Sequence, residues 1–295
     1  MSRSLAYAML LLGTFFWGVS FVVIKQGTLS YPPALFLAWR YLLASAVLAM
    51  LFARRLPGLG RAGLLAGTWL GLVLYVGTMT QTIGLGSTTA SNAGFIAGTA
   101  LIFVPFFKYL LDRTRLTGAV LGSCVLALAG LAALSLDWPI RLRPGDLWVL
   151  TSAAAYGLQI VLAGRYVHRH DPMALTLVQL FCCCLCCLLQ ALVAGQPLTL
   201  PATAAVWQAI GFTALLATAF TYGAQNLAQQ TVEEHKVALI FLTEPIFASL
   251  AGYLYLGEAL TWRLALGGGL ILSAILLAEF SFQRRPAVSG AEAGP

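Results

Sequence analysis

Apolar runs long enough to cross a lipid bilayer follow one another along almost the whole chain. About 20 apolar residues span the hydrocarbon layer as a helix. Runs of this length recur with only short polar segments between them. The pattern predicts ten transmembrane helices, at residues 5–25, 33–53, 63–83, 91–111, 118–136, 145–166, 173–194, 203–227, 237–256 and 262–282.

The composition changes this picture only by excluding a soluble fold. Apolar residues make up 60% of the 295-residue chain, charged residues only 9%, and the mean hydropathy is +0.86. A soluble domain carries about 25% charged residues. Because so few charges cannot cover a water-exposed surface, we predict an all-α polytopic membrane protein whose surroundings are the lipid bilayer, without a separate soluble domain.

The net charge of +7 follows from where Lys and Arg lie. If the N-terminus is cytoplasmic, Arg40 lies within a span and only Lys25, Arg141, Arg143 and Arg263 face outside, which leaves twelve of the 17 basic residues inside. This bias predicts a multi-pass protein of the cytoplasmic (inner) membrane with both termini cytoplasmic. No basic stripe with interleaved aromatic side chains is present, so we expect no nucleic-acid partner.

An internal repeat appears when the chain is shifted by about 140 residues. The offsets of 139 and 144 align Trp17-Gly18 with Tyr156-Gly157, Gln81 with Gln225, and Leu116-Thr117 with Leu260-Thr261. Five spans per copy is an odd number, so the second copy must enter the membrane from the opposite side.

The repeat therefore predicts two inverted five-helix units, at residues 1–137 and 138–285, and a monomer that is complete in one chain. The Ala/Gly/Pro-rich segment 286–295 is expected to be a disordered tail.

Two charged residues fall deep within predicted spans, Arg40 and Glu244. A charge at the centre of a membrane helix costs about 2.5–3.5 kcal/mol. Arg40 could hold a substrate carboxylate through two hydrogen bonds, and Glu244 could hold an amine or carry a coupling proton. Alternatively, each side chain reaches the membrane surface or forms a fixed internal pair.

Prolines and polar side chains mark the same region of the spans. Pro105 and Pro245 remove helical hydrogen bonds, and broken helices are common at transporter sites. Amides and aromatic residues also recur at helical spacing, as in Tyr222, Gln225 and Gln229 at i, i+3 and i+7. Such side chains line a polar cavity or form hydrogen bonds between helices, each worth about 0.6 kcal/mol.

Catalytic and metal-binding motifs are missing from the sequence. Five of the six cysteines lie between Cys182 and Cys187, within a span that offers no His or carboxylate to complete a ligand set. The three histidines lie in predicted loops, and neither a Walker A nor an H-E-x-x-H motif is found. We therefore expect packing cysteines, no metal, no cofactor and no enzymatic activity.

Several motifs together resemble one family of transporters. The segment 88–98 (TTASNAGFIAG) precedes Phe103-Val104-Pro105, and Leu242-Thr243-Glu244-Pro245 precedes Gly257-Glu258-Ala259-Leu260-Thr261. Residues 5–282 thus resemble the EamA-type transporters of the drug/metabolite transporter superfamily, and are most similar to the aromatic amino-acid exporter type. The resemblance implies ten helices in inverted repeats around a central cavity, with the fifth and tenth helices as scaffold, and export of amino acids, other metabolites or drugs.

Two departures from the family pattern bear on coupling. Thr114 stands where the second repeat has Glu258, so the Gly-Glu signature occurs once. The first helix also has no acid, whereas the short four-helix multidrug relatives carry one there.

We predict an exporter of small metabolites, amino acids foremost, that works by alternating access through a central cavity. The alternative is a multidrug efflux pump for lipophilic cations with Glu244 as the anchor. A nucleotide-sugar carrier would need clustered intramembrane Lys or Arg. The candidate substrate-binding residues are Trp17, Arg40, Tyr75, Gln81, Phe95, Tyr156, Gln159, Tyr222, Gln225 and Glu244.

Overall fold

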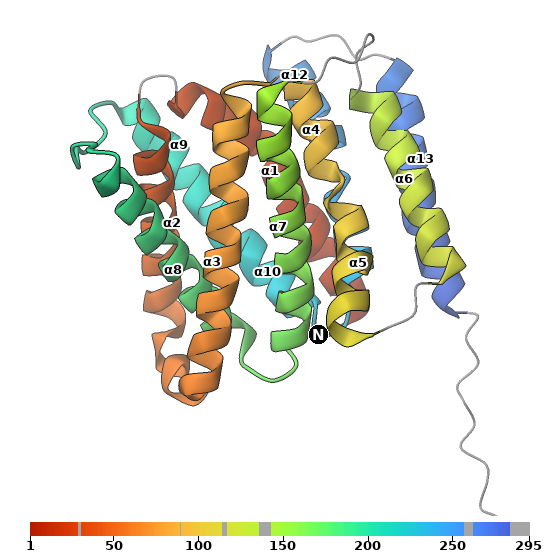
Figure 1. The fold of residues 1–295 in the computed structure, drawn as a ribbon, viewed down its shortest axis with the longest axis horizontal. Helices are drawn as coiled ribbons and strands as arrows, with labels where there is room; N and C mark the ends of the chain where they lie inside the picture. The colour runs from red at the N-terminus through yellow and green to blue at the C-terminus, as the bar shows by residue number, and fades with distance from the viewer. Residues whose placement is uncertain (29–30, 89, 114–116, 136–142, 257–261, 284–295) are drawn as a thin grey trace, which may run out of the picture.

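The computed structural model describes residues 1–28, 31–88, 90–113, 117–135, 143–256 and 262–283, and throughout these residues the regular secondary structure is helical (Figure 1). The predicted tail at 286–295 lies outside the described residues. The first half of the chain forms α1 Arg3–Thr28, α2 Pro33–Phe52, α3 Gly60–Leu85, α4 Ala90–Gly98, α5 Ala100–Asp112 and α6 Gly118–Ser135. The second half forms α7 Pro144–Tyr166, α8 Pro172–Val193, α9 Ala204–Ala214, α10 Thr221–Ala228, α11 Glu234–Phe241, α12 Glu244–Leu256 and α13 Trp262–Gln283.

Two short segments depart from α geometry. The 3₁₀ segment η1, Ala53–Leu59, joins α2 to α3, and the π-helical turn η2, Leu215–Phe220, joins α9 to α10. The sequence predicted a continuous span at 203–227, so the π turn is a departure from that prediction.

The helices have the length and composition of membrane spans. Five described stretches are long and apolar enough to cross a bilayer: Pro33–Gly84, Phe95–Asp112, Pro144–Tyr166, Pro172–Val193 and Ala204–Ala228. η1 divides the first stretch into α2 and α3. Large apolar side chains such as Trp69, Val125 and Leu254 are exposed on the outer surface. In water such a surface would be unfavourable, so the chain is a multi-pass membrane protein.

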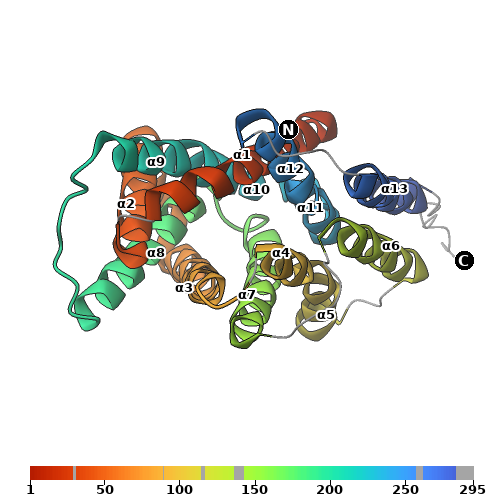
Figure 2. The ribbon, with the colours of Figure 1, turned by 90° about the horizontal axis from the view of Figure 1, so that it is seen from above.

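The helix pair α6–α13 forms one edge of the molecule, and α2 with α8 lies at the other (Figures 1 and 2). Backbones touch where α6 and α13 cross. A Cβ atom at Gly130 would lie 2.7 Å from the Gly267 carbonyl oxygen, and one at Gly267 would lie 2.5 Å from the Gly130 carbonyl oxygen. Small residues allow this close approach in a membrane, where packing rather than hydrophobicity joins helices.

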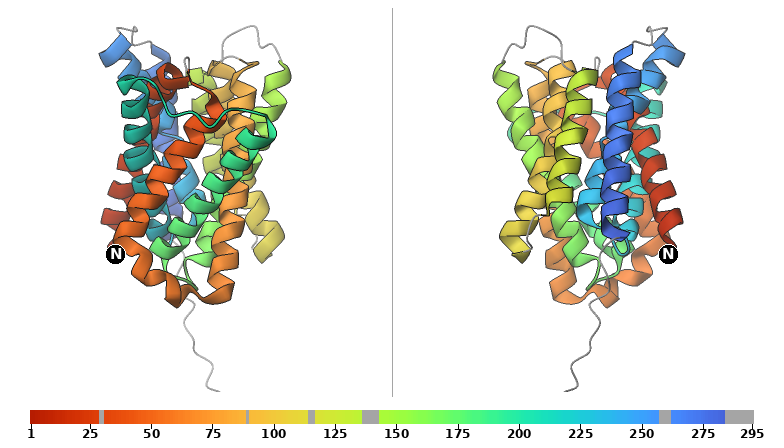
Figure 3. Two further views of the ribbon diagram at one scale, coloured as in Figure 1. Left: turned by 90° about the vertical axis from the view of Figure 1, so that its left-hand side faces the viewer. Right: turned by 90° about the vertical axis from the view of Figure 1, so that its right-hand side faces the viewer.

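The two halves repeat the same packing plan. α1 packs on α10 and α12, while α7 packs on α3 and on α4–α5, which are the corresponding pairs. A Cβ at Gly18 would lie 2.7 Å from the Phe247 Cβ, and a Cβ at Gly157 would lie 2.7 Å from the Phe103 Cβ. These residues pair at the offsets of 139 and 144 found in the sequence. Figure 3 shows the two edges at which the halves meet.

Two of the predicted spans are broken, each at a threonine. The expected span at 91–111 is divided at Thr99, and the one at 237–256 is divided at Leu242-Thr243. The Thr99 hydroxyl donates to the Ile96 carbonyl at 2.5 Å, and the Thr243 hydroxyl donates to the Ile240 carbonyl at 2.7 Å. Both pairs are 144 residues apart, so the two breaks are copies of one turn.

The two prolines relate differently to these breaks: Pro245 directly follows the second break, as the sequence led us to expect, whereas Pro105 does not mark the first. Pro105 lies inside α5, six residues after Thr99, and the Leu101 carbonyl that it leaves free faces the Cys124 thiol at 3.9 Å. Pro245 is the second residue of α12. The amides of the first helical residues have no carbonyl partner within the helix. A proline, which has no amide hydrogen, therefore fits at the start of a helix without a kink.

Candidate functional site

Arg40 of α2 and Glu244 at the start of α12 lie deep in the fold and near each other. The charge of Arg40 is close enough to act on Glu244 and on the phenols of Tyr156 and Tyr222. Within the described residues, however, neither Arg40 nor Glu244 belongs to an ion pair. The structure therefore brings opposite charges together without joining them directly.

The Arg40 side chain is 7% exposed and is held by the π turn. Its Nε–H donates to the Thr218 hydroxyl oxygen at 2.5 Å, and its Nη2 donates to the Ala217 carbonyl at 3.3 Å. The indole Nε1 of Trp17 donates to the same carbonyl at 2.6 Å. Arg40 thus neither reaches the membrane surface nor forms the internal ion pair that the sequence allowed.

Threonines account for the π turn that offers these acceptors. The Thr218 hydroxyl donates to the Thr213 carbonyl at 2.8 Å, and the Thr221 hydroxyl donates to the Leu216 carbonyl at 2.9 Å, each five residues back. The Thr221 amide bonds to the Thr218 carbonyl rather than to that of Ala217, its partner in an α-helix. Hydroxyl bonds of this kind compete with the helical ladder, and π turns are frequent at functional sites.

Aromatic rings adjoin the same region. The ring of Trp17 meets those of Tyr222 and Phe241 edge to face, with centroids 5.6 Å and 4.7 Å apart. Trp17, Phe241 and Glu244 are partly accessible. The Glu244 carboxylate has no hydrogen-bond partner among the described residues, and Glu244 follows Phe241 by three residues across the second break.

Tyr156 of α7 connects a second set of polar side chains, on α3, to the region around Arg40. Its hydroxyl donates to the Gln81 side-chain oxygen at 3.0 Å and to the Thr78 hydroxyl at 3.4 Å. The Tyr41 hydroxyl, also bonded to Thr78 at 3.0 Å, extends this network to α2. Tyr156 and Gln81 are both partly accessible, as expected of residues that line a cavity.

Gln159 and Gln225 are sealed in the interior and bonded to each other, with Gln225 Nε2 donating to Gln159 Oε1 at 3.0 Å. Gln225 also donates to Gln229, whose own amide donates to the Ile160 carbonyl at 2.7 Å. These contacts show that Gln225 and Gln229 both face α7, while the ring of Tyr222 meets Trp17 of α1. They also show a seam between α7 and α10 in this conformation rather than a cavity wall.

Besides Gln159 and Gln225, two more of the expected residues, Tyr75 and Phe95, lie away from Arg40 and Glu244. Tyr75 donates to the Gln190 side chain of α8 at 2.7 Å, and Phe95 packs against the apolar core around Leu101 and Leu131. Gln81 and Gln225 do not contact each other, although both bond to α7. The residues that do converge are Trp17, Arg40, Gln81, Tyr156, Tyr222 and Glu244.

Sequence reasoning missed Thr218 and the Ala217 carbonyl. The signal that was present is the density of threonines, Thr213, Thr218 and Thr221, because their hydroxyls compete with the helical ladder for backbone carbonyls. Two of the cysteines adjoin α2: Cys183 contacts Tyr41, and the Cys184 thiol faces the Ala38 carbonyl at 3.5 Å. Within the described ranges, no group of three or more His, Cys, Asp or Glu is arranged to hold a metal.

The two ends of the bundle differ in how they are closed. The end that holds the N-terminus and η1, here called the basic end, carries ion pairs between Lys108 of α5 and Glu234 of α11 and between Arg165 and Asp112. Glu234 is buried, although the sequence placed it in a loop. It fits there because Gly164 lacks a side chain: a Cβ would lie 2.5 Å from a Glu234 carboxylate oxygen.

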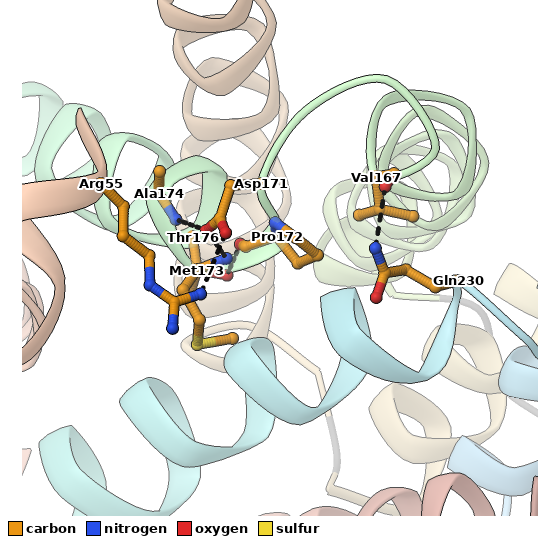
Figure 4. A network of polar contacts seen from close by, with 8 residues as sticks. All are labelled: Arg55, Val167, Asp171, Pro172, Met173, Ala174, Thr176 and Gln230. Carbon is orange, nitrogen blue, oxygen red and sulfur yellow. Dashed lines mark hydrogen bonds and ion pairs between the residues drawn. The ribbon is translucent and has the colours of Figure 1, made fainter. Parts of the chain in front are cut away.

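Further contacts at the basic end join the two halves of the chain. Arg55 after α2 pairs with Asp171 at 3.0 Å, and Asp171 caps α8 by accepting from two of its first amides (Figure 4). Within the second half, Gln230 donates to the Val167 carbonyl at 3.3 Å. In the middle of the bundle, residues 95–100 around the first break and 244–249 directly after the second are all partly accessible.

Comparison with known proteins gives the context for this site. The model of the EamA-like transporter family matches residues 4–136 and again residues 143–280. A protein of Archaeoglobus fulgidus named as an uncharacterized transporter is 28% identical over 88% of this chain and 81% of its own length. The inner membrane transporter YedA of Escherichia coli is 24% identical over 92% of this chain and 91% of its own length.

A solved crystal structure shares the fold. It superposes with a TM-score of 0.79 and covers 96% of this chain and 99% of its own, at 18% sequence identity. At that identity the likeness describes the architecture alone.

Proposed function

The chain belongs to the EamA-like transporter family, and from this premise we propose that it exports small zwitterionic metabolites, amino acids foremost, by alternating access. The observation that carries the proposal is the separated pair of charges at Arg40 and Glu244. Both lie among partly accessible aromatic residues, and each keeps hydrogen-bonding capacity unused by the described residues.

An amino acid offers the complement of each charge. Arg40 uses Nε and one Nη2 hydrogen for η2, and its Nη1 has no hydrogen-bond partner among the described residues. A substrate carboxylate can accept from that guanidinium, while the substrate ammonium faces Glu244. Unpaired charges deep in a membrane are costly. Binding a zwitterion relieves both at once, whereas a neutral or singly charged molecule relieves at most one.

The apolar part of the substrate has a surface to contact as well. Trp17 and Phe241 are partly accessible, their rings meet each other, and Phe241 lies three residues before Glu244 in the chain. Aromatic faces accept large apolar side chains. The aromatic amino acids are therefore the first substrates to test.

The proposal includes the arrangement in the membrane. With ten crossings in two inverted repeats, the basic end faces the cytoplasm under the positive-inside rule, and both termini lie there. The relative YedA is named as an inner membrane transporter, which supports the same membrane here. The breaks at Thr99 and Thr243 let the outer parts of two helices move relative to the inner parts, and one chain holds the complete site as a monomer.

Transport by purified protein in liposomes tests this function. Vesicles receive radiolabelled amino acids or cationic dyes, and uptake is compared with that of empty vesicles. We expect amino acids to cross faster with the protein, and Arg40→Gln to reduce their flux at least about tenfold, since a charge-assisted bond is lost. Arg55→Gln, which removes an exposed arginine, is the matched control and keeps the flux. If no amino acid crosses faster than in empty vesicles, the proposal fails.

A second candidate function is efflux of lipophilic cations. The observation that favours it is that Glu244 has no hydrogen-bond partner among the described residues and that Phe241, whose ring meets Trp17, lies three residues before it, because cations bind aromatic faces and carboxylates. In that case the dyes cross, Glu244→Gln abolishes their flux and Arg40→Gln does not reduce it. An imposed pH gradient separates proton coupling from substrate binding. If transport by the Glu244→Gln variant still responds to the gradient, Glu244 does not carry the coupling proton.

A further inference from the structure

We propose that Thr218 of the π turn is a positioning residue that fixes which edge of the Arg40 guanidinium meets the substrate, and that it thereby makes the site select a free carboxylate. The proposal rests on the proposed function for its biological meaning. Thr218 acts on the substrate only by orienting Arg40, and the geometry of the two side chains is given by the described contacts alone.

A guanidinium presents its five N–H donors in a rigid planar fork. In Arg40, the edge formed by Nε and Nη2 points at the π turn, where Thr218 Oγ1 lies 2.5 Å from Nε and the Ala217 carbonyl oxygen lies 3.3 Å from Nη2. Because the fork is rigid, engaging this edge also sets the direction of the other edge, formed by Nη1 and the second Nη2 hydrogen. That edge offers two parallel N–H groups, the arrangement that a carboxylate accepts with both oxygens.

Thr218 can act only as an acceptor toward Arg40. Its single hydroxyl hydrogen is committed to the Thr213 carbonyl at 2.8 Å. The oxygen lone pairs are therefore turned to the guanidinium, and the hydroxyl cannot rotate without losing that bond. The neighbouring Ala217 carbonyl also accepts from Trp17 at 2.6 Å, which ties the indole and the guanidinium to the same turn.

The π turn has no counterpart in the other half of the chain. At an offset of 144, Thr218 corresponds to Leu74, a fully buried apolar residue, and α3 continues through that position as a regular helix. At an offset of 139, Arg40 corresponds to Gln179. The first half builds the same architecture without a π turn. The fold itself therefore does not require the π turn that the second half has at Thr218. It occurs where a buried guanidinium needs to be oriented.

This orientation predicts discrimination between a carboxylate and a carboxamide of the same shape. A carboxamide has one oxygen to accept and places an NH₂ donor against the second N–H of the fork, which leaves two donors facing each other. Sites built to hydrogen-bond a particular group reject analogues that leave buried polar groups unpaired. The expected ligand class is therefore a small molecule with a free carboxylate, and its amide or ester binds weakly.

The test uses Thr218→Val, which keeps the shape and removes the acceptor, and Thr218→Ser, which keeps the acceptor. In liposomes we compare phenylalanine with phenylalanine amide. We expect Thr218→Val to raise KM for phenylalanine about tenfold with little change in kcat, and to reduce the preference over the amide. Thr218→Ser keeps both values. In the Arg40→Gln background, Thr218→Val adds no further loss, since it acts only through Arg40.

A second measurement separates this proposal from the proposed function. The Tm of the purified protein in detergent is followed with benzoate or benzamide, which needs no transport. We expect benzoate to raise the Tm of the natural chain and of Thr218→Ser more than benzamide does, and Thr218→Val to lose the difference. If benzoate and benzamide act alike on the natural chain, or if Thr218→Val retains the difference, the proposal is overturned. Failure of amino-acid transport with the benzoate preference intact overturns the proposed function alone.

Discussion

At the basic end of the bundle, α5 and α11 pack against each other and Lys108 meets Glu234 across them. At the opposite end lie α4 and α12, the other parts of the same two broken helices. There the described residues show no comparable packing between the two, and residues 244–249, where α12 leaves the second break, are partly accessible. One end is thus closed by packing and charge, while the other is looser, although both are built on the same repeated plan.

This difference bears on the proposal that the two repeats are inverted, because it shows where they differ. Two identical halves would make the states open to either side equal in energy, so any preference must come from residues that the repeat does not match. At an offset of 144, Glu234 corresponds to Ala90 and Lys108 to Gly252, which cannot form an ion pair. The ion pair at the basic end therefore favours the state that is closed there.

The largest effect is expected from breaking that pair with Glu234→Gln. Glu234 is buried and Lys108 is partly exposed, so the loss lies at or below the 3–5 kcal/mol typical of a fully buried pair. We expect the basic end to open. Thiol labelling of an introduced Ala238→Cys should then rise at least about tenfold, while labelling of Ala97→Cys near the opposite end falls.

The charge exchange Lys108→Glu with Glu234→Lys is the control, because it restores an ion pair with the charges reversed. It should return labelling of Ala238→Cys toward that of the natural pair. Equal labelling in all three backgrounds would show that the pair does not hold the basic end closed.

The next effect tests whether the two halves are packed alike. Gly18→Ala and Gly157→Ala each place a Cβ 2.7 Å from a phenylalanine Cβ on the facing helix. Overpacking of this kind costs about 1–3 kcal/mol, and we expect the two variants to lower the Tm by similar amounts. Gly211→Ala, where a Cβ meets no atom within 4 Å, is the matched control. A large loss in only one half would contradict equal packing.

A smaller effect is expected at the two breaks. Thr99→Ala and Thr243→Ala each remove one hydroxyl bond to an isoleucine carbonyl, worth about 0.6 kcal/mol in a membrane. We expect little loss of stability but a change in transport rate, because the turn is less well defined. Thr→Ser variants at the same positions should keep the natural transport rate. A transport rate unchanged by Thr→Ala would show that the hydroxyls play no part in the movement.

The smallest effect concerns the ion pair of Arg55 with Asp171. Both side chains are substantially exposed, at 52% and 35%, so the pair contributes only about 0.2–1 kcal/mol and is weakened by salt. Arg55→Ala should leave Ala238→Cys labelling unchanged. If it opens the basic end as Glu234→Gln does, then closure depends on total charge rather than on the buried pair.

Hydropathy predicted most of the helical elements because membrane spans depend on long apolar runs, and α2, α3, α7 and α8 lie close to their predicted positions. The sequence pointed to broken helices through Pro105 and Pro245; the second break does lie beside Pro245, whereas the first lies at Thr99, six residues before Pro105. Glu234 was placed in a loop because hydropathy does not reveal a charged partner on another helix such as Lys108.

The candidate site was predicted in part, for a related reason. Arg40 and Glu244 stood out because charge is rare in a span, and the structure does bring them together. Gln225 and Gln159 were recognised as polar, but the sequence does not say that they bond to each other. Tyr75 looked equivalent to Tyr156, yet its hydroxyl meets Gln190 instead. Which face of a helix meets which neighbour depends on tertiary packing.

The two edges of the molecule have a mechanical consequence. The repeat exchanges α6 with α13 and α2 with α8, so each of these pairs is mapped onto itself, and the line that relates the halves passes through both seams. Under the alternating access proposed above, points on such a line stay in place while the halves rock against each other. The backbone contact of Gly130 with Gly267 therefore lies on the fulcrum, where tight packing does not oppose the movement that it supports.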